Sequence, residues 1–280
     1  MMTRGPVGKL LAALVVALTA IFATGASAGE FIEMAGAPTP EGRPVRLVGY
    51  LARPPGSGPF PAVVLVHGCG GFHSNMISWA DRLLRFGYVA LAVDSFGPRG
   101  LDEDCNGAGF PYQVPDSYVA LRYLSTQPYV RASHVAVMGF SQGGWSVLAA
   151  LEKEGVERRS QEKFRAGIAL YPVCQFSTGL MTAPVLVLIG DADSWTPAAD
   201  CEAMVAGRTE LGSPRPPGDR SMVELVIFPK AHHAFDVLDL SLAPSQGTTS
   251  HGHRVEYNEE ATRSSIVKVR TFLARMMERP

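Results

Sequence analysis

The sequence predicts an α/β fold: a mostly parallel central sheet with helices on both faces, in one domain without a large lid. Short, continuous apolar runs rich in Val, Ile and Leu recur along the chain, as in strands buried on both faces of a sheet. Segments with helical spacing separate these runs. The 280 residues are 46% apolar and 18% charged, enough for one sizeable core, and no internal linker divides residues 29–280.

The predicted elements alternate along the chain. Residues 29–44 are rich in Pro and Gly and predict an extended arm. Strands are predicted at residues 45–52, 61–68, 88–96, 134–140, 166–172, 183–190 and 222–228. Helices are predicted at residues 78–87, 116–127, 143–151, 197–206 and 258–277, with a long loop over 95–115. This alternation indicates parallel strands joined by crossover helices.

The first 28 residues have the layout of a secretory signal peptide. Arg4 and Lys9 precede an apolar run of about 14 residues, and Ala26-Ser27-Ala28 supplies a small-x-small cleavage signal. The alternative is a membrane anchor, but the run is shorter than the roughly 20 residues that span a bilayer. We expect cleavage after Ala28 and export to the periplasm or the medium, with no membrane contact afterwards.

The charge balance argues against two classes of partner. The formal net charge is −1, and residues 1–28 hold two positive charges and no acid, so the mature chain carries −3. Neither value favours binding to nucleic acid or to an anionic membrane. The oligomeric state stays open.

An exported chain meets an oxidising compartment, which favours disulfides among its four cysteines. The preferred pairing joins neighbours in sequence, Cys69 with Cys105 and Cys174 with Cys201, although four cysteines allow three pairings. The alternative is four free, buried thiols. No CxxC pair is present, which argues against zinc.

One serine sits where a predicted strand meets a predicted helix. Gly139-Phe140-Ser141-Gln142-Gly143 matches G-x-S-x-G, whose chemistry needs this strand-turn-helix setting. A sharp turn there strains the serine backbone and points its hydroxyl to the carboxyl end of the sheet, where such sheets bind ligands. The N-terminus of the next helix adds partial positive charge. We therefore predict that Ser141 is a nucleophile rather than an ordinary turn residue.

A serine nucleophile needs a base and an orienting acid, expected in the chain order Ser, Asp, His. "VLVLIGDADSWTP" supplies the acid, and the spacing favours Asp193 over Asp191, a turn residue that binds local backbone. "FPKAHHAFD" supplies the base, for which we select His233. His232 is then a surface or supporting residue, and Asp200 belongs to the first turn of the following helix.

The oxyanion of the reaction needs two backbone donors. One is the N–H of Gln142, directly after the nucleophile, and the other the N–H of Cys69 in the glycine-rich loop of residues 67–71. A disulfide at Cys69 would pin that loop. The glycines could also simply make a turn, and Cys69 could be read as a thiol nucleophile, but the strand-turn-helix bend belongs to Ser141.

Other residues near these motifs are candidates for the substrate pocket. Phe72, Trp145, Tyr171 and Trp195 adjoin the motifs and could equally be core residues. His67 is expected to pack beneath the oxyanion loop. His251-Gly252-His253 could suggest a metal, but it ends a Ser/Thr/Gly-rich loop that contains no carboxylate, so no metal site is predicted.

"HGCGGF", "GYVALAVDSFGPRG", "GFSQGGW", "GDADSWTP" and "AHHAF" together resemble the dienelactone hydrolase family of α/β-hydrolases, over about residues 45–277. The resemblance implies hydrolysis of an ester or lactone through an acyl-enzyme, without a cofactor. The family's nucleophile, acid and base correspond to Ser141, Asp193 and His233.

The chain departs from the namesake enzymes in two places. They carry a cysteine nucleophile, where this chain has Ser141, and an acidic residue where it has Gly68. Dienelactone itself is therefore a doubtful substrate. An arginine that binds the substrate carboxylate in the namesake has a weak counterpart in Arg99, which does not align cleanly.

These observations predict an exported serine hydrolase of small esters or lactones. The short segment 171–184 predicts an open pocket rather than a lidded lipase, with the loop 95–115 as one wall. One alternative is a peptidase or amidase of the prolyl-oligopeptidase type, which usually needs an extra domain that this chain has no room for. Another is a binding protein on a hydrolase scaffold, since fold resemblance alone does not prove activity.

Overall fold

The computed structural model describes residues 29–39, 42–106, 110–212, 222–239 and 251–277. The predicted signal peptide, residues 1–28, lies outside them. Eight strands form one sheet: β1 (Glu30–Ala35), β2 (Arg46–Ala52), β3 (Phe60–Val66), β4 (Val89–Asp94), β5 (Val130–Phe140), β6 (Ala166–Leu170), β7 (Val185–Gly190) and β8 (Val223–Phe228).

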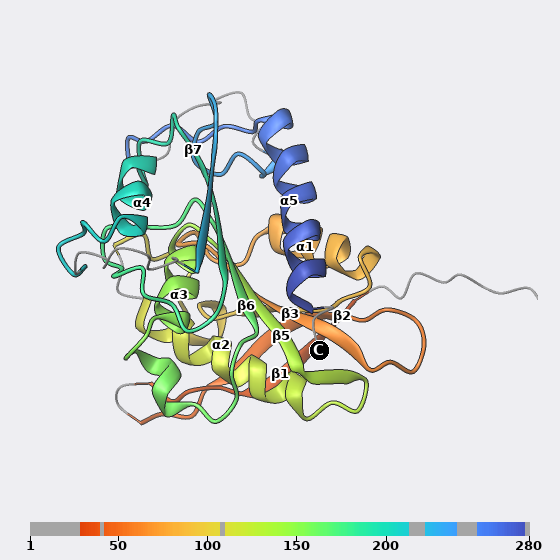
Figure 1. Ribbon diagram of the computed structural model, residues 1–280. Coiled ribbons are helices and arrows are strands. Elements are labelled where there is room, and N and C mark those ends of the chain that lie inside the picture. Colours follow the sequence, from red (N-terminus) through yellow and green to blue (C-terminus); the bar gives the residue numbers. More distant parts are fainter. Residues whose placement is uncertain (1–28, 40–41, 107–109, 213–221, 240–250, 278–280) are drawn as a thin grey trace, which may run out of the picture.

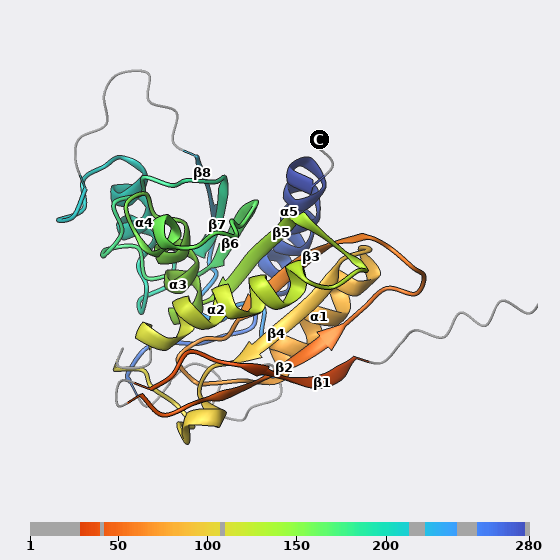
Figure 2. The same ribbon diagram turned by 90° about the horizontal axis from the view of Figure 1, so that it is seen from below.

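Within the described residues, five α-helices and two short 3-10 helices accompany these strands. The α-helices are α1 (Ser74–Arg85), α2 (Phe110–Ser125), α3 (Gln142–Leu151), α4 (Ala198–Val205) and α5 (Glu259–Met277). The 3-10 helices are η1 (Gly97–Arg99) and η2 (Val156–Arg159). Helices α1 and α5 cover one face of the sheet, and α2, α3 and α4 cover the other (Figures 1 and 2). The predicted fold class is confirmed.

The strand order is β1-β2-β4-β3-β5-β6-β7-β8. Strand β2 runs antiparallel to both β1 and β4, and every later pair in the order is parallel. The parallel strands lie between helices on both faces, and β3 and β7 are almost wholly buried, which explains the continuous apolar runs. Their carboxyl ends therefore lie along one edge, where the segments that follow β3, β5, β6, β7 and β8 can meet.

Two sequence predictions are corrected. The expected arm contains the edge strand β1, in which Phe31 pairs with Tyr50 and Met34 with Leu47 of β2. Helix α2 begins at Phe110, six residues before the predicted start, and holds Pro115 in its interior. Proline lacks the N–H that bonds to the preceding turn, so it marked a false boundary in the sequence.

Helix α3 lies at the centre of the molecule. Eight of its ten residues are buried, among them the pair Gly143 and Gly144. Adding a Cβ at Gly144 would place it 3.0 Å from the Leu170 carbonyl oxygen of β6. The small residues thus let the helix N-terminus approach the sheet directly behind Ser141.

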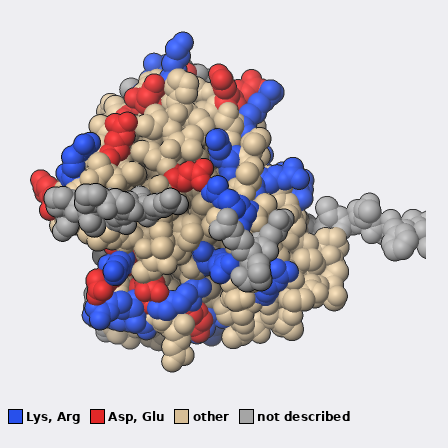
Figure 3. Space-filling model, in the orientation of Figure 1, with Lys and Arg blue, Asp and Glu red and all other residues tan. Residues whose placement is uncertain are grey.

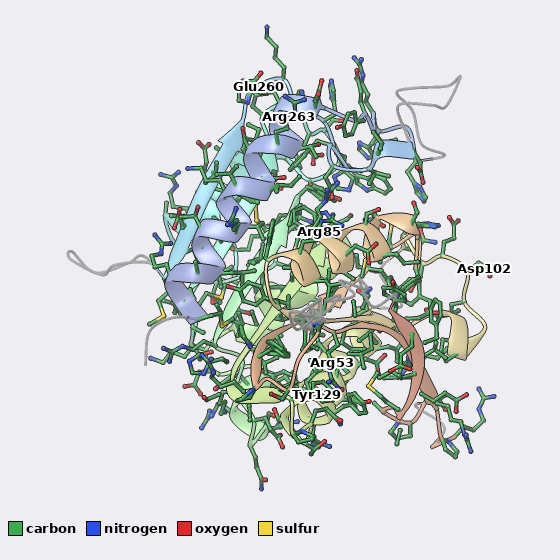
Figure 4. All side chains as sticks on the ribbon, turned by 90° about the vertical axis from the view of Figure 1, so that its right-hand side faces the viewer. Arg53, Arg85, Asp102, Tyr129, Glu260 and Arg263 are labelled. Carbon is green, nitrogen blue, oxygen red and sulfur yellow. A yellow bond between two sulfur atoms is a disulfide. The ribbon has the colours of Figure 1, made fainter. Side chains whose placement is uncertain are left out.

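The outer surface carries mixed charge. Lys and Arg side chains lie among Asp and Glu side chains over the face in Figure 3. Some cations also cover apolar surface: the Arg53 guanidinium lies 4.4 Å from the centre of the Tyr129 ring (Figure 4). In the described part of the chain, no helix is both long and apolar enough to cross a bilayer.

Candidate active site

Ser141 occupies a strained turn between β5 and α3. Its φ of 54° and ψ of −117° lie outside the regions that residues with a side chain normally adopt. The Ser141 N–H donates to the Leu170 carbonyl oxygen at 2.9 Å, and its own carbonyl accepts from Trp145 N–H at 3.0 Å, the first bond of the helix. Both ends of the turn are therefore held by hydrogen bonds while the hydroxyl is left to point outward.

The flanking glycines are required by backbone crowding. A Cβ on Gly139 would lie 2.1 Å from the carbonyl oxygen of Gly143. A Cβ on Gly143 would lie 2.3 Å from the carbonyl oxygen of His67, in the loop after β3. Three backbone segments thus pack without side chains between them, and only glycine fits at either position.

The structure brings Ser141, His233 and Asp193 together in one hydrogen-bonded line. His233 Nε2 lies 2.9 Å from Ser141 Oγ, and His233 Nδ1 lies 2.8 Å from Asp193 Oδ2. An ionised carboxylate can only accept, so the proton is assigned to Nδ1 and Nε2 presents its lone pair to the serine. The imidazole can therefore take a proton from the hydroxyl.

Asp193 is held as an anion by its hydrogen bonds. Burial alone would raise the pKa of Asp193, but the hydrogen bond and charge of His233, with further bonds from Thr196, outweigh it and lower the pKa. The N–H groups of Trp195 and Thr196 both donate to Asp193 Oδ1 at 2.9 Å. Thr196 Oγ1 lies 2.9 Å from Oδ2. The loop after β7 therefore fixes the carboxylate before it meets the histidine.

A second buried carboxylate, Asp236, lies three residues after His233 and had no role in the sequence analysis. It accepts from Trp79 Nε1 and from the Tyr171 hydroxyl, each at 2.6 Å. Burial raises the pKa of Asp236, and these two neutral donors only partly offset it. The Tyr171 ring in turn meets the His233 ring edge-on at 4.8 Å. The only sequence signal was the final Asp of "AHHAFD".

The loop after β3 lies against the serine. A Cβ on Gly68 would be 3.5 Å from Ser141 Cβ. Cys69 is bonded to Cys105, and its carbonyl accepts from Asp104 N–H at 2.7 Å. The Gln142 side chain donates to the Asp104 carbonyl at 3.1 Å. Within the described residues, the backbone N–H groups of Cys69 and Gln142 have no acceptor in the protein.

The second disulfide joins Cys174 and Cys201, so both bonds have the pairing that the sequence favours. Cys201 lies in α4 and Cys174 in the segment that follows β6. Neither half of this second bond lines the cavity in front of Ser141.

A cavity of about 630 Å³ opens in front of Ser141. Tyr171 and Trp195 lie in its lining. Glu103 and Cys105 also lie there and belong to the loop 95–115, which the sequence predicts as one wall. The Trp195 ring lies 5.0 Å from that of His233. Of the segment 171–184, Tyr171 alone reaches the lining among the described residues.

Three predicted pocket residues lie outside this lining, which corrects the prediction. Phe72 packs against the Phe31 ring at 6.3 Å, and Trp145 against the Phe176 ring at 5.4 Å. Arg99 is buried and donates to both carboxylate oxygens of Asp116, at 2.8 and 3.0 Å. Being next to a motif in sequence did not turn these side chains toward the site.

Three further histidines, His67, His251 and His253, have structural partners. His67 is buried and accepts from Ser95 N–H on Nε2 at 3.1 Å, while Nδ1 lies 2.7 Å from the Gly68 carbonyl. Burial lowers the pKa of His67, so the ring is neutral beneath the loop. His251 and His253 stack on Trp195 at 5.3 and 5.4 Å.

The other polar residues that the sequence places next to the site lie as follows. His232 Nδ1 lies 2.8 Å from the Ala192 carbonyl. Asp191 accepts from Lys230 N–H at 2.6 Å, so it binds the backbone of the neighbouring loop rather than local backbone, which corrects that prediction. Asp200 lies in the first turn of α4. Among the residues that the structure describes, no group of three or more His, Cys, Asp or Glu could hold a metal ion.

The chain is similar in sequence to known proteins. A family model described as "Dienelactone hydrolase family" matches residues 47–277. A protein of Bradyrhizobium sp named "Probable 2-oxo-3-(5-oxofuran-2-ylidene)propanoate lactonase" is 29% identical over 205 residues, covering 66% of this chain and 77% of that protein.

Solved structures agree in fold. A dienelactone hydrolase from Anabaena variabilis has a TM-score of 0.60 at 18% identity, over 89% of this chain and 99% of that one. A hyperthermophilic esterase from Pyrobaculum calidifontis has a TM-score of 0.59 at 17% identity, over 89% of this chain and 85% of that one. The shared architecture is the α/β-hydrolase fold.

Proposed function

The chain belongs to the dienelactone hydrolase family and is a hydrolase of esters or lactones, and we propose that it works through a Ser141-His233-Asp193 triad. The observation that carries the proposal is the unbroken line of hydrogen bonds from the Ser141 hydroxyl through His233 to Asp193. The strained backbone of Ser141 supports it, because such strain clusters at functional sites.

In the first half of the reaction, Ser141 Oγ attacks the carbonyl carbon of the ester. The proton of the hydroxyl passes to His233 Nε2, and the ring becomes an imidazolium that the Asp193 carboxylate stabilises. When the tetrahedral intermediate collapses, the carbon–oxygen bond to the leaving alcohol breaks. His233 gives its proton to that alcohol, and an acyl-serine remains.

In the second half, water replaces the alcohol. His233 takes a proton from the water as it attacks the acyl carbonyl, and then returns a proton to Ser141 Oγ as the acid leaves. A lactone follows the same steps, except that the leaving alcohol stays attached to the acyl group.

The negative oxygen of each tetrahedral intermediate is bound by the N–H groups of Gln142 and Cys69 in this proposal. Three features support it: Gln142 opens helix α3, Gly68 lies against Ser141, and neither N–H has an acceptor within the described residues. The Cys69–Cys105 bond and the Asp104 N–H then hold the donor loop in place.

We also propose that the chain is exported, with residues 1–28 as a cleaved signal peptide. Two disulfides among the described residues favour an oxidising compartment. The peptidase and the non-catalytic alternatives are less well supported than ester hydrolysis, because the family match names hydrolases of a lactone.

The test is hydrolysis of 4-nitrophenyl acetate and butyrate by the oxidised chain from residue 29, beside a Ser141→Ala variant. Turnover should fall by at least about 10³-fold in the variant. Ser146→Ala is the matched control, since this buried serine lies in α3, directly after the turn of Ser141, and its hydroxyl bonds Gln113 and the Gln142 carbonyl. Equal turnover by Ser141→Ala and wild type would overturn the proposal.

A further inference from the structure

The charge in the cavity differs from what a carboxylate-bearing substrate needs. Its described lining contains the carboxylates Glu103 and Asp239 and no lysine or arginine. Two adjoining stretches, residues 107–109 and 240–250, contain no charged residue in the sequence. They therefore cannot supply a cation to the cavity.

Arg99, the arginine that the sequence offered as a ligand for a substrate carboxylate, binds a carboxylate of the protein instead. Arg99 makes a two-pronged ion pair with Asp116, and both side chains are almost fully buried. It also donates to the carbonyls of Ser95 and Ala37. Turning Arg99 toward a substrate would leave the Asp116 carboxylate buried without its partner, which is strongly unfavourable.

Besides the imidazoles in its lining and the N-terminus of α3 behind Ser141, the cavity wall contains the N-terminus of α1, and Asp239 lies against it. Ser74, the first residue of α1, donates from Oγ to Asp239 Oδ2 at 2.5 Å. A helix N-terminus attracts anions, and this one already has a carboxylate of the protein beside it. Arg99 is thus matched by Asp116, and the α1 terminus by Asp239.

We propose that this cavity selects uncharged esters and rejects those that carry a carboxylate at the end of a short acyl chain. This inference rests on the proposed function and names its substrate class. A carboxylate entering the cavity would lose water without gaining a counter-charge and would meet Glu103 and Asp239. The name of the Bradyrhizobium relative contains a propanoate, which is a carboxylate. The inference therefore predicts a different class of substrate for this chain.

The test compares two esters of the same shape. In mono-4-nitrophenyl adipate a carboxylate ends the acyl chain, and in 4-nitrophenyl 6-methylheptanoate an isopropyl group takes its place. At pH 8, kcat/KM for the adipate should be lower than for the isostere by about 30-fold or more. A ratio below about 3-fold would overturn the inference while leaving ester hydrolysis intact.

Asp239→Asn sharpens the test, because it uncovers the N-terminus of α1. It should raise the ratio of kcat/KM for the adipate to kcat/KM for the isostere by about 5-fold. Glu260→Gln on α5 removes the same charge away from the cavity and is the matched control (Figure 4). An equal gain in both variants, or none in Asp239→Asn, would overturn the role of Asp239.

Failure of this inference is distinguishable from failure of the proposed function. Loss of turnover with all esters, 4-nitrophenyl acetate included, would count against the proposed function. Turnover of the acetate alone would overturn the inference, because the cavity would then exclude the chain rather than its charge.

Discussion

Asp193 and Asp236 are two buried carboxylates near His233, and their environments are opposite. Asp193 faces a ring that can become a cation, and its pKa is lowered. Asp236 faces the hydroxyl of Tyr171 and the indole of Trp79, and burial raises its pKa. Burial alone therefore does not assign a role to an acid; the charge of its partner does.

The comparison divides the surroundings of His233 into two parts. The loop after β7 carries Asp193 and orients the ring through Nδ1. Asp236 ties Tyr171 to Trp79 and supports the aromatic wall against which the ring packs. Changes to Asp193 are expected to lower the rate of hydrolysis, and changes to Asp236 are expected to lower the free energy of unfolding.

The largest expected effect is that of Asp193→Asn. An asparagine amide can donate to Nδ1 and so favour the wrong tautomer, which should lower kcat by about 10³- to 10⁴-fold. The measurement is kcat for 4-nitrophenyl butyrate, with circular dichroism to show that the variant is folded. A loss below about 10-fold would make Asp193 a structural residue and break the comparison.

Asp236→Asn should produce the reverse pattern. Asparagine cannot accept from both Trp79 and Tyr171 as the carboxylate does, so the free energy of unfolding should fall by about 1–3 kcal/mol. We expect kcat to stay within about 3-fold, measured beside urea unfolding of the same preparation. If kcat falls as far as in Asp193→Asn, Asp236 belongs with the reacting groups.

Thr196→Val tests the support of the first carboxylate. It removes the hydroxyl 2.9 Å from Asp193 Oδ2 but keeps the backbone N–H that bonds Oδ1. Because one of several bonds is lost, kcat should fall by only about 3- to 10-fold. Thr178→Val is the control, since that hydroxyl bonds Glu152 away from the site. Equal losses in both variants would contradict the prediction.

The smallest effect is a pH dependence of stability at Asp236. A raised pKa means that the folded state binds the proton more tightly than the unfolded state. Stability from this group is therefore present below the ordinary aspartate pKa and lost as pH rises through the raised one. The destabilisation caused by Asp236→Asn should be larger at pH 5 than at pH 7.5 in urea unfolding. The opposite trend would mean that the carboxylate is stabilised as an anion.

Local sequence pattern predicted most of the sheet, and strand order along the chain predicted which loops meet. Ser141, Asp193 and His233 each follow an apolar strand, so their convergence could be read from the sequence. Strand β1 could not, because an edge strand paired with one neighbour has little apolar pattern.

Side-chain direction and distant partners were beyond the sequence. Asp236 binds residues 157 and 65 positions away, so no local motif marks it. Trp145 follows Ser141 by four residues, yet its ring packs on Phe176. Arg99 lies in the expected loop but turns to Asp116 in α2. These contacts depend on how the layers pack.

The Cys69–Cys105 bond gives the proposed export a chemical consequence. Thiols are kept reduced in the cytosol, and the disulfides of an exported chain form after it leaves that compartment. On the proposed function, the newly made chain lacks the covalent tie between its oxyanion loop and residue 105. Inside the cell, where other esters are present, the oxyanion loop is therefore not cross-linked. Oxidation after export forms the bond that holds this loop.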